Sequence, residues 1–362
     1  MDASDISRRR LLGAAGVAGA AAAVGLAAAA EARAAAATTT TTATGTSQLD
    51  EPRLPLNVLL LAGLSADRVA RLRELSPQLT VSREVDLASA DVVFGPLSRE
   101  RLARAPKLRW VQWLGAGVEH APLEELIARD VILTNAQGCY APEIAEHVFA
   151  LLFALTRGIA QEVRRRSWGY EGPSPVGLRG MTMGIIGLGG IGRETARRAK
   201  AMDMKVIAVD AEPMLAEKFA YVDEVSLVEE GLTDLLKRAD VLVLAAPHTP
   251  RTRGMIGAEQ LAAMKKGSYL INVARGPLVK TGALLDALTS GHLAGAGLDV
   301  TDPEPLPADH PLWRQPNVVI TSHIAGRSQF SWDRVQDVFT GNVARFVHRL
   351  PMVNVVDKRK GY

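Results

Sequence analysis

The stretch Met181-Thr-Met-Gly-Ile-Ile-Gly-Leu-Gly-Gly-Ile-Gly192 has the pattern of a buried strand that runs into a glycine loop and then a helix. Gly187, Gly189 and Gly192 stand in the spacing G-x-G-x-x-G. In such a loop the first glycine permits a tight turn, the second lets the backbone approach a pyrophosphate, and the third lets the helix pack close to the strand. The predicted helix at 193–202 points its free N–H groups at phosphates. The stretch therefore predicts a dinucleotide-binding turn.

A second apolar run at 205–209 ends in Asp210, 23 residues after Gly187. A carboxylate at this place accepts hydrogen bonds from the ribose 2′-OH of NAD and would repel a 2′-phosphate. The following Ala211-Glu212-Pro213 supplies no arginine to neutralise such a phosphate, so we predict NAD rather than NADP. The alternative is a glycine-rich turn with a chance acid, but strand, loop, helix, strand and acid occur here in order.

Length and composition set further bounds. A chain of 362 residues can hold about two domains, and 48% hydrophobic with 22% charged residues is an ordinary globular composition. The net charge of +3 is small for this length, so we predict no nucleic-acid partner despite a pI of 9.0. We predict the arginine clusters at 164–166 and 197–198 on solvated helix faces. Cys139 is the only cysteine, which excludes internal disulfides and multi-cysteine zinc sites. We predict no metal site.

The N-terminus resembles a twin-arginine export signal. Ser7-Arg8-Arg9-Arg10-Leu11-Leu12 precedes an Ala-rich apolar run, and Ala32-Arg33-Ala34 offers a small-x-small cleavage pattern. We predict a signal at 1–34, an Ala/Thr-rich linker at 35–53, and a periplasmic or extracellular protein. The alternatives are a weak membrane anchor, a start codon placed too far upstream with a cytoplasmic protein, and plain low complexity. The run is poorly hydrophobic for a permanent span, so no stable membrane insertion is predicted.

Strand-type apolar runs alternate with helical segments along the rest of the chain. Before the glycine loop, the predicted strands are 56–61, 91–94, 108–113 and 131–134, with helices at 66–75, 98–105 and 122–128. After it, the predicted strands are 240–245, 268–273, 297–300 and 318–321. This alternation predicts an α/β fold with two doubly wound parallel-sheet domains, about six strands lying in the nucleotide domain.

Two long helices are predicted on either side of the dinucleotide-binding strands in the sequence. One begins near Pro142 and is apolar almost all round over 144–159, so it should be buried between domains or against another subunit. The other, at 328–349, lies beyond the last nucleotide-domain strand and should pack on the first domain. The predicted boundaries are 54–136 for the substrate domain, completed by 325–362, and 137–324 for the dinucleotide-binding domain.

Three polar residues follow predicted strands of the nucleotide domain: Arg275, Glu304 and His323. Ligands in open α/β sheets bind beyond the carboxyl ends of the strands, so these side chains can converge on one crevice. An arginine fixes a substrate carboxylate, a histidine moves a proton, and a glutamate holds the imidazole and favours its charged form. Taken singly, each also has a structural explanation: a surface ion pair, a solvated loop acid, and a capping or core histidine.

Four motifs carry a family resemblance. They are Gly187-Leu-Gly-Gly-Ile-Gly192; Asn272-Val-Ala-Arg-Gly-Pro-Leu-Val279; Gly297-Leu-Asp-Val300 with Pro303-Glu-Pro-Leu-Pro307 and His310-Pro-Leu-Trp313; and Ser322-His-Ile-Ala-Gly326. In this order and spacing they resemble the D-isomer specific 2-hydroxyacid dehydrogenases over about residues 56–356. The resemblance implies a Rossmann-type nucleotide domain inserted in a flavodoxin-like substrate domain, with an interdomain cleft. It also implies hydride transfer between NAD(H) and a small D-2-hydroxy acid or 2-keto acid.

The resemblance further implies roles for individual residues. The catalytic set would be Arg275, Glu304 and His323, and the long helix from Pro142 would form a homodimer interface. The cofactor would contact Gly187, Gly189, Gly190, Ile191, Gly192, Asp210, Pro247, Asp299 and the backbone of Ala274. The substrate carboxylate would bind Arg275 and backbone N–H groups of Leu114, Gly115, Ala116 and Gly117.

Departures from the family pattern leave the substrate open. Ser322 stands where many relatives have proline, and Thr301-Asp302 replaces a commoner Phe-Glu type pair. The chain lacks a further C-terminal regulatory domain, which argues against the long phosphoglycerate dehydrogenases, while glyoxylate, hydroxypyruvate and bulkier 2-keto acids remain open. Cys139 and Tyr140 are expected near the crevice, Cys139 as a packed core residue. The alternative function is a non-catalytic, dinucleotide-sensing binding protein on the same fold.

Overall fold

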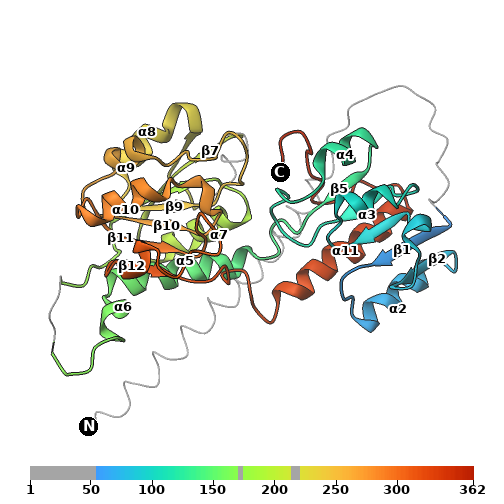
Figure 1. The fold of residues 1–362 in the computed structure, drawn as a ribbon, viewed down its shortest axis with the longest axis horizontal. Coiled ribbons are helices and arrows are strands. Elements are labelled where there is room, and N and C mark those ends of the chain that lie inside the picture. The colour runs from blue at the N-terminus through green and yellow to red at the C-terminus, as the bar shows by residue number, and fades with distance from the viewer. Residues whose placement is uncertain (1–53, 170–173, 213–220) are drawn as a thin grey trace, which may run out of the picture. The chain divides into compact units, whose positions relative to one another are not determined.

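The computed structural model of the chain describes residues 54–169, 174–212 and 221–362. The predicted signal at 1–34 and linker at 35–53 lie outside these residues, as does Pro213. The described residues form two separate parallel sheets with helices around each (Figure 1). This confirms the predicted α/β fold with two parallel-sheet domains. In these three ranges, every helix is too short or too polar to span a bilayer.

The first sheet has five parallel strands in the order β2-β1-β3-β4-β5. The strands are β1 (Leu56–Leu60), β2 (Leu79–Ser82), β3 (Val92–Phe94), β4 (Trp110–Gln112) and β5 (Ile132–Thr134). The accompanying helices are α2 (Ala66–Leu75), α3 (Arg99–Ala103), α4 (Leu123–Ala128), α11 (Ser331–Val347) and the 3-10 turn η1 (Leu87–Ser89). The strands read as short apolar runs because helices cover both faces. Strand β2 was not predicted.

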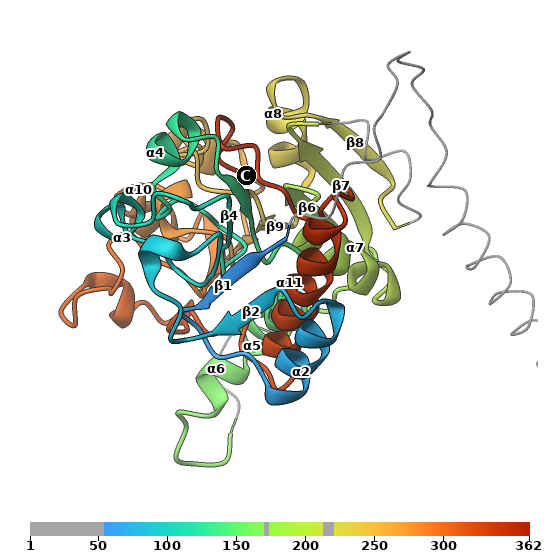
Figure 2. The same ribbon diagram turned by 90° about the vertical axis from the view of Figure 1, so that its right-hand side faces the viewer.

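The C-terminal helix α11 completes the first sheet's core, as predicted. The Phe94 ring of β3 stacks on Phe339 of α11 at 4.3 Å between ring centroids. Trp110 of β4 is fully buried and packs against Phe339 and Phe346. Figure 2 shows α11 running beside α2, and the Arg68 guanidinium of α2 donates to Asp337 of α11 at 2.9 Å.

The second sheet has seven parallel strands in the order β12-β11-β10-β9-β6-β7-β8. The strands are β6 (Thr182–Ile186), β7 (Lys205–Asp210), β8 (Glu224–Leu227), β9 (Val241–Leu244), β10 (Ser268–Asn272), β11 (Leu293–Leu298) and β12 (Val318–Ile320). The predicted number of about six missed the edge strand β8. The predicted strand at 297–300 is also corrected: β11 ends at Leu298, so Asp299 and Val300 lie beyond the strand.

Helices cover both faces of the second sheet. On one face, α5 (Ala141–Thr156) and α7 (Gly190–Ala201) share a core with Met183 and Ile185 of β6. On the other, α8 (Val228–Arg238), α9 (Ala258–Ala263) and α10 (Thr281–Thr289) share a core with Ile186 and Leu242. The 3-10 turns η3 (Gly276–Leu278) and η4 (Pro311–Arg314) follow β10 and β11. Strand β6 ends at Ile186 and α7 begins at Gly190, so the glycine loop lies between the carboxyl end of the strand and the start of the helix.

Helix α5 is shorter than the sequence pattern predicted. It ends at Thr156 because Gly158 turns the chain with a φ of +68°, and the short α6 (Ile159–Glu162) follows. Ile159 is 48% exposed, so the buried apolar surface predicted over 144–159 stops before it. The prediction that arginines 164–166 lie on a helix is wrong, since α6 ends at Glu162. Arginines 197–198 lie in α7, as predicted.

Candidate active site

Two glycines of the loop after β6 are required by the fold itself. Gly187 has a φ of +95°, and a Cβ there would lie 2.8 Å from the Ala246 backbone nitrogen. A Cβ on Gly192 would lie 2.0 Å from the Gly187 carbonyl oxygen. A side chain at either position would force the loop, the neighbouring strand end and α7 apart. These two positions are glycine for reasons internal to the protein.

Gly189 differs from its neighbours. Within the described part of the chain, a Cβ on Gly189 would approach only the Gln137 Nε2, at 4.0 Å. Internal packing therefore does not demand a glycine here. Gly189 is the N-cap residue of the 12-residue helix α7, and Gly190 and Ile191 form its first turn. A bare backbone at a helix N-terminus fits a pyrophosphate that must come close to it.

Asp210 is held beside this loop. It is the last residue of β7, and its Oδ2 accepts a hydrogen bond from the Leu188 N–H at 2.6 Å. Its Oδ1 accepts from the Glu212 N–H at 2.9 Å. The carboxylate is therefore fixed next to the glycine loop, where a ribose-binding carboxylate was predicted.

One nearby cation was not predicted from the sequence. The Nζ of Lys360 lies 2.5 Å from Glu212 Oε1.

His323 and Glu304 are in direct contact. His323 Nδ1 lies 2.7 Å from Glu304 Oε1, which confirms the predicted pairing of these two residues. The side chains are 48% and 41% exposed. His323 follows β12 in a left-handed backbone conformation with a φ of +51°. Because Glu304 engages Nδ1, Nε2 is the ring nitrogen that can face a substrate.

Asp299 fixes the turn that carries His323. Its buried carboxylate accepts hydrogen bonds from the Thr321 hydroxyl at 2.6 Å and from the N–H groups of Ile324 and Ala325 at 3.0 Å each. Its carbonyl accepts from the His323 N–H at 2.8 Å. The His147 Nε2 of α5 lies 3.5 Å from the same carboxylate. These bonds offset the left-handed conformation of His323.

The Arg275 guanidinium is paired with a residue that sequence reasoning missed. Its Nε donates to Glu119 Oε1 at 2.5 Å, and its Nη1 donates to the Ala274 carbonyl at 2.7 Å. The Arg275 and Glu119 side chains are 26% and 18% exposed. Burial acts to raise the pKa of Glu119, but the charge and hydrogen bonds of Arg275 outweigh it and hold that pKa below its ordinary value. The structure thus brings His323 to Glu304, and Arg275 to Glu119.

The carbonyl groups of the 114–117 loop accept hydrogen bonds from neighbouring residues of the protein. Those of Leu114, Gly115 and Ala116 accept from the Tyr140 hydroxyl at 2.7 Å, the Ala136 N–H at 2.9 Å and the Asn135 Nδ2 at 2.7 Å. In a trans peptide the N–H points away from the preceding carbonyl. The N–H groups of Gly115, Ala116 and Gly117, which follow these carbonyls, therefore each point away from the partner of the preceding carbonyl.

The remaining predicted residues have simpler surroundings. Pro247 is exposed beyond β9, and the Ala274 N–H donates to Asn272 Oδ1 at 3.1 Å. Cys139 is buried in the core of the first sheet, which confirms its packing role, and burial raises its pKa to about 11. Burial also raises the pKa of Tyr140 to about 12. Neither side chain is suited to exchange protons at neutral pH.

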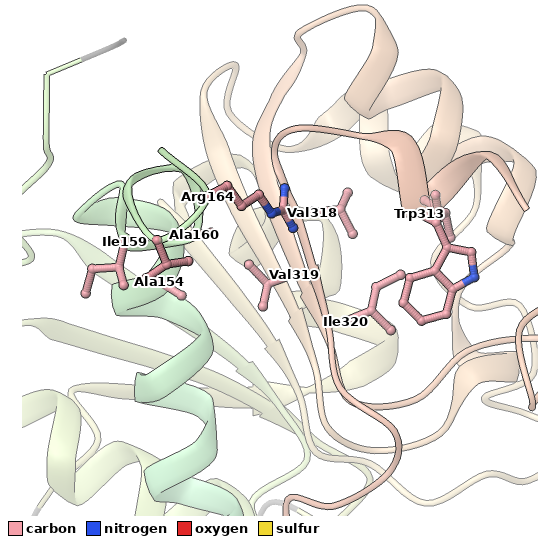
Figure 3. A pocket seen from close by; sticks show the side chains of 10 residues that line it. Ala154, Ile159, Ala160, Arg164, Trp313, Val318, Val319 and Ile320 are labelled. Atoms are coloured by element: carbon pink, nitrogen blue, oxygen red, sulfur yellow. The ribbon is translucent and has the colours of Figure 1, made fainter. Parts of the chain in front are cut away.

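A surface hollow of about 310 Å³ lies away from these residues, next to α6 and β12 (Figure 3). Its lining includes Ile159, Val163, Arg164, Trp313, Val319 and Ile320. It contains none of the predicted site residues, so the candidate site is defined by the polar side chains at the strand ends and not by this hollow.

Comparison with known proteins identifies the family. The model described as "D-isomer specific 2-hydroxyacid dehydrogenase, NAD binding domain" matches residues 149–325. A glycerate dehydrogenase from Methylorubrum extorquens is 36% identical over 277 residues, which are 72% of this chain and 83% of that protein. The chain belongs to the D-isomer specific 2-hydroxyacid dehydrogenase family. It therefore carries the NAD-binding domain of a family of oxidoreductases, as its motifs predicted.

Relatives within this dehydrogenase family differ in length and in name. A D-3-phosphoglycerate dehydrogenase from Methanocaldococcus jannaschii is 34% identical over 268 residues, 71% of this chain and 50% of that protein. The chain thus spans about half the length of the phosphoglycerate dehydrogenases it matches. The structure of a family member from Xanthobacter autotrophicus in complex with NADPH and MES has a TM-score of 0.71 and 30% identity, covering 85% of this chain and 100% of that one.

Proposed function

We propose that the protein is an NAD-dependent oxidoreductase that transfers a hydride between NAD(H) and a small D-2-hydroxy acid or 2-keto acid. The observation that carries this proposal is the contact of 2.7 Å between His323 Nδ1 and Glu304 Oε1. A carboxylate that engages one ring nitrogen fixes the orientation of the imidazole and leaves the other nitrogen for a proton-transfer partner. A protein that only sensed a dinucleotide would not need this pair.

The roles of the residues follow from their geometry and charge. Arg275 and the N–H groups of the 114–117 loop bind the substrate carboxylate, since a guanidinium can pair with it bidentately. When bound, NADH supplies the hydride that reduces the carbonyl carbon. His323 donates a proton from Nε2 to the carbonyl oxygen, and Glu304 holds the imidazole ring in the orientation that this transfer needs. In the oxidation direction the neutral imidazole takes the proton from the hydroxyl.

NAD(H) is the proposed cofactor in preference to NADP(H). The Asp210 carboxylate is held against the glycine loop by the Leu188 N–H, where it can accept a hydrogen bond from a ribose hydroxyl. A 2′-phosphate at the same place would meet a fixed negative charge. Lys360 does not alter this argument, because its ammonium is paired with Glu212.

Small unphosphorylated 2-keto acids such as glyoxylate and hydroxypyruvate are the proposed substrates. The test is NADH oxidation by the purified chain over a panel of 2-keto acids of increasing size. We expect turnover of the small members and formation of the D-isomer of the hydroxy acid, with turnover strongly reduced in His323→Ala. If NADH binds, as followed by its fluorescence, but no keto acid is reduced, the protein is a binding protein and the proposal is wrong.

We also propose export through the N-terminal signal and assembly as a homodimer, on the strength of the twin-arginine pattern and the family resemblance. Replacing Arg8 and Arg9 with lysine should retain the protein in the cytoplasm, measured by cell fractionation. An uncleaved cytoplasmic chain with or without those changes would favour the upstream-start explanation. Sedimentation at several concentrations should give twice the mass of the chain.

A further inference from the structure

Glu119 lies within the part of the candidate site proposed to bind the substrate carboxylate. It follows the 114–117 loop directly after Val118, and its Oε1 lies 2.5 Å from Arg275 Nε. The side chain is 18% exposed, so water screens this ion pair less than it screens a surface pair. A carboxylate of the protein therefore already engages the guanidinium proposed to recognise a carboxylate of the substrate.

The backbone of the same loop lies against this ion pair. A Cβ built on Gly117 would lie 2.2 Å from Arg275 Nη2 and 2.3 Å from Glu119 Oε2. The guanidinium and the carboxylate thus both pack over the Cα of Gly117. A glycine at 117 is required for this arrangement, because any side chain would occupy the space of both charged groups. Glu119 therefore places its carboxylate against both elements, Arg275 and the loop, that the proposed function assigns to the substrate.

Other charged groups surround the pair. Burial lowers the pKa of His248, and the positive charges of Arg253 and Arg275 lower it further, while Glu119 and Asp302 oppose them. Glu119 is therefore electrostatically coupled to Arg275 and His248, which both follow strands of the second sheet. Its negative charge offsets part of the attraction that Arg275 and Arg253 would otherwise exert on anions.

We propose that Glu119 is a specificity-determining residue: it holds Arg275 when no substrate is bound, yields it to the carboxylate of a monoanionic 2-keto acid, and disfavours substrates that carry a second anionic group. The proposal rests on the proposed function and narrows its substrate class. Exchange of one carboxylate for another on the same guanidinium gains less than binding to an unpaired guanidinium. The displaced carboxylate stays tethered two residues from Gly117, so its charge continues to repel a phosphate on the substrate.

The test is Glu119→Gln, which keeps the shape and a hydrogen-bonding oxygen but removes the charge. KM for glyoxylate should fall about tenfold with kcat changed less than about twofold, since the negative charge of Glu119 no longer competes with the substrate carboxylate for Arg275. The ratio of kcat/KM for phosphohydroxypyruvate to kcat/KM for hydroxypyruvate should rise by about tenfold or more. Glu124→Gln is the matched control, because Glu124 is 90% exposed, and it should change neither quantity.

A binding measurement separates this inference from the proposed function. Oxamate is an unreactive monoanionic analogue of a 2-keto acid, and calorimetry with NADH present should show it binding about tenfold more tightly to Glu119→Gln than to the native chain. This result does not depend on turnover. If the native chain reduces no keto acid, the proposed function fails while the oxamate result still decides the role of Glu119.

Two outcomes would overturn the inference. A raised KM and weaker oxamate binding in Glu119→Gln would mean that Glu119 supports Arg275 and does not compete for it. Unchanged KM, oxamate affinity and substrate ratio would mean that the ion pair is irrelevant to binding. Glu119→Asp provides a second variant if the glutamine variant unfolds: its shorter arm should lower KM while the retained charge preserves discrimination against phosphohydroxypyruvate.

Discussion

Two carboxylates of the candidate site each hold one cationic partner, in different surroundings. Glu304 and His323 are 41% and 48% exposed and both come from the strand ends of the second sheet. Glu119 and Arg275 are 18% and 26% exposed, and they belong to segments that follow strands of different sheets. A pair open to solvent can exchange a proton without separating. A half-buried pair that blocks a binding group must separate, so we infer that the first pair serves proton transfer and the second substrate selection.

The largest effect should come from removing the proton donor. His323→Ala should lower kcat for 2-keto acid reduction by about 10²–10⁴-fold, the usual contribution of a general acid. Single-turnover measurements with NADH and glyoxylate would check this. Glu304→Gln keeps a hydrogen bond to Nδ1 but loses the charge, so it should cost only about tenfold. Near-normal kcat in His323→Ala would place the acid elsewhere and remove the functional difference between the two pairs.

Substitutions in the second pair, Glu119 and Arg275, should change KM and leave kcat nearly unchanged. Arg275→Lys should raise KM for glyoxylate on the order of 100-fold, because an ammonium cannot reproduce the bidentate geometry of a guanidinium. Steady-state kinetics would measure this, with the dissociation constant of NADH as the control that should not change. An unchanged KM would exclude Arg275 from substrate binding and would leave Glu119 without a role in selection.

Asp210 offers a third carboxylate for the comparison, since its described partners are backbone N–H groups and not a cation. Asp210→Ala should narrow the preference for NADH over NADPH by about tenfold, as the fixed charge that repels a 2′-phosphate is lost. The ratio of kcat/KM for the two cofactors measures the change. Equal or better use of NADPH by the native protein would contradict the proposed role of Asp210.

Tyr140 should give the smallest effect. Its hydroxyl donates to the Leu114 carbonyl at 2.7 Å and its pKa is raised to about 12 by burial, so it is a poor proton donor at neutral pH. Tyr140→Phe should leave kcat within about twofold and reduce the free energy of unfolding by about 1 kcal/mol, the net value of one hydrogen bond. Kinetics and urea unfolding would check both. A loss of rate as large as that of His323→Ala would instead identify Tyr140 as the acid.

The difference between the two pairs also explains what could be predicted from sequence. Glu304 and His323 are 19 residues apart and follow strands of one sheet, so motif order alone indicated their contact. Glu119 and Arg275 are 156 residues apart and follow strands of different sheets. Hydrophobic periodicity predicts strands and helices, but it carries no information on which side chains of two sheets come into contact. Arg275 was predicted as a binding group, but its partner could be found only in the structure.

The strands show the same limit. Central strands such as β9 are buried throughout and appear in the sequence as continuous apolar runs. Strands β2 and β8 lie at sheet edges and alternate between more and less exposed residues, Leu79-Thr-Val-Ser82 and Glu224-Val-Ser-Leu227. Their patterns are short and half polar, so they were missed, whereas the glycine loop was predicted because φ and close packing restrict Gly187 and Gly192 to one residue type.

Helix α11 also determines when each domain can be completed during synthesis. The core of the first sheet contains Phe339 and Phe346, which are translated after every strand of both sheets. The helices and strands of the second sheet all lie between Ala141 and Ile320 in one continuous stretch. We expect chains that end before Ser331 and have been released from the ribosome to protect the second domain from protease while the first is still cleaved. The domain that begins the described chain would then be the last to finish folding.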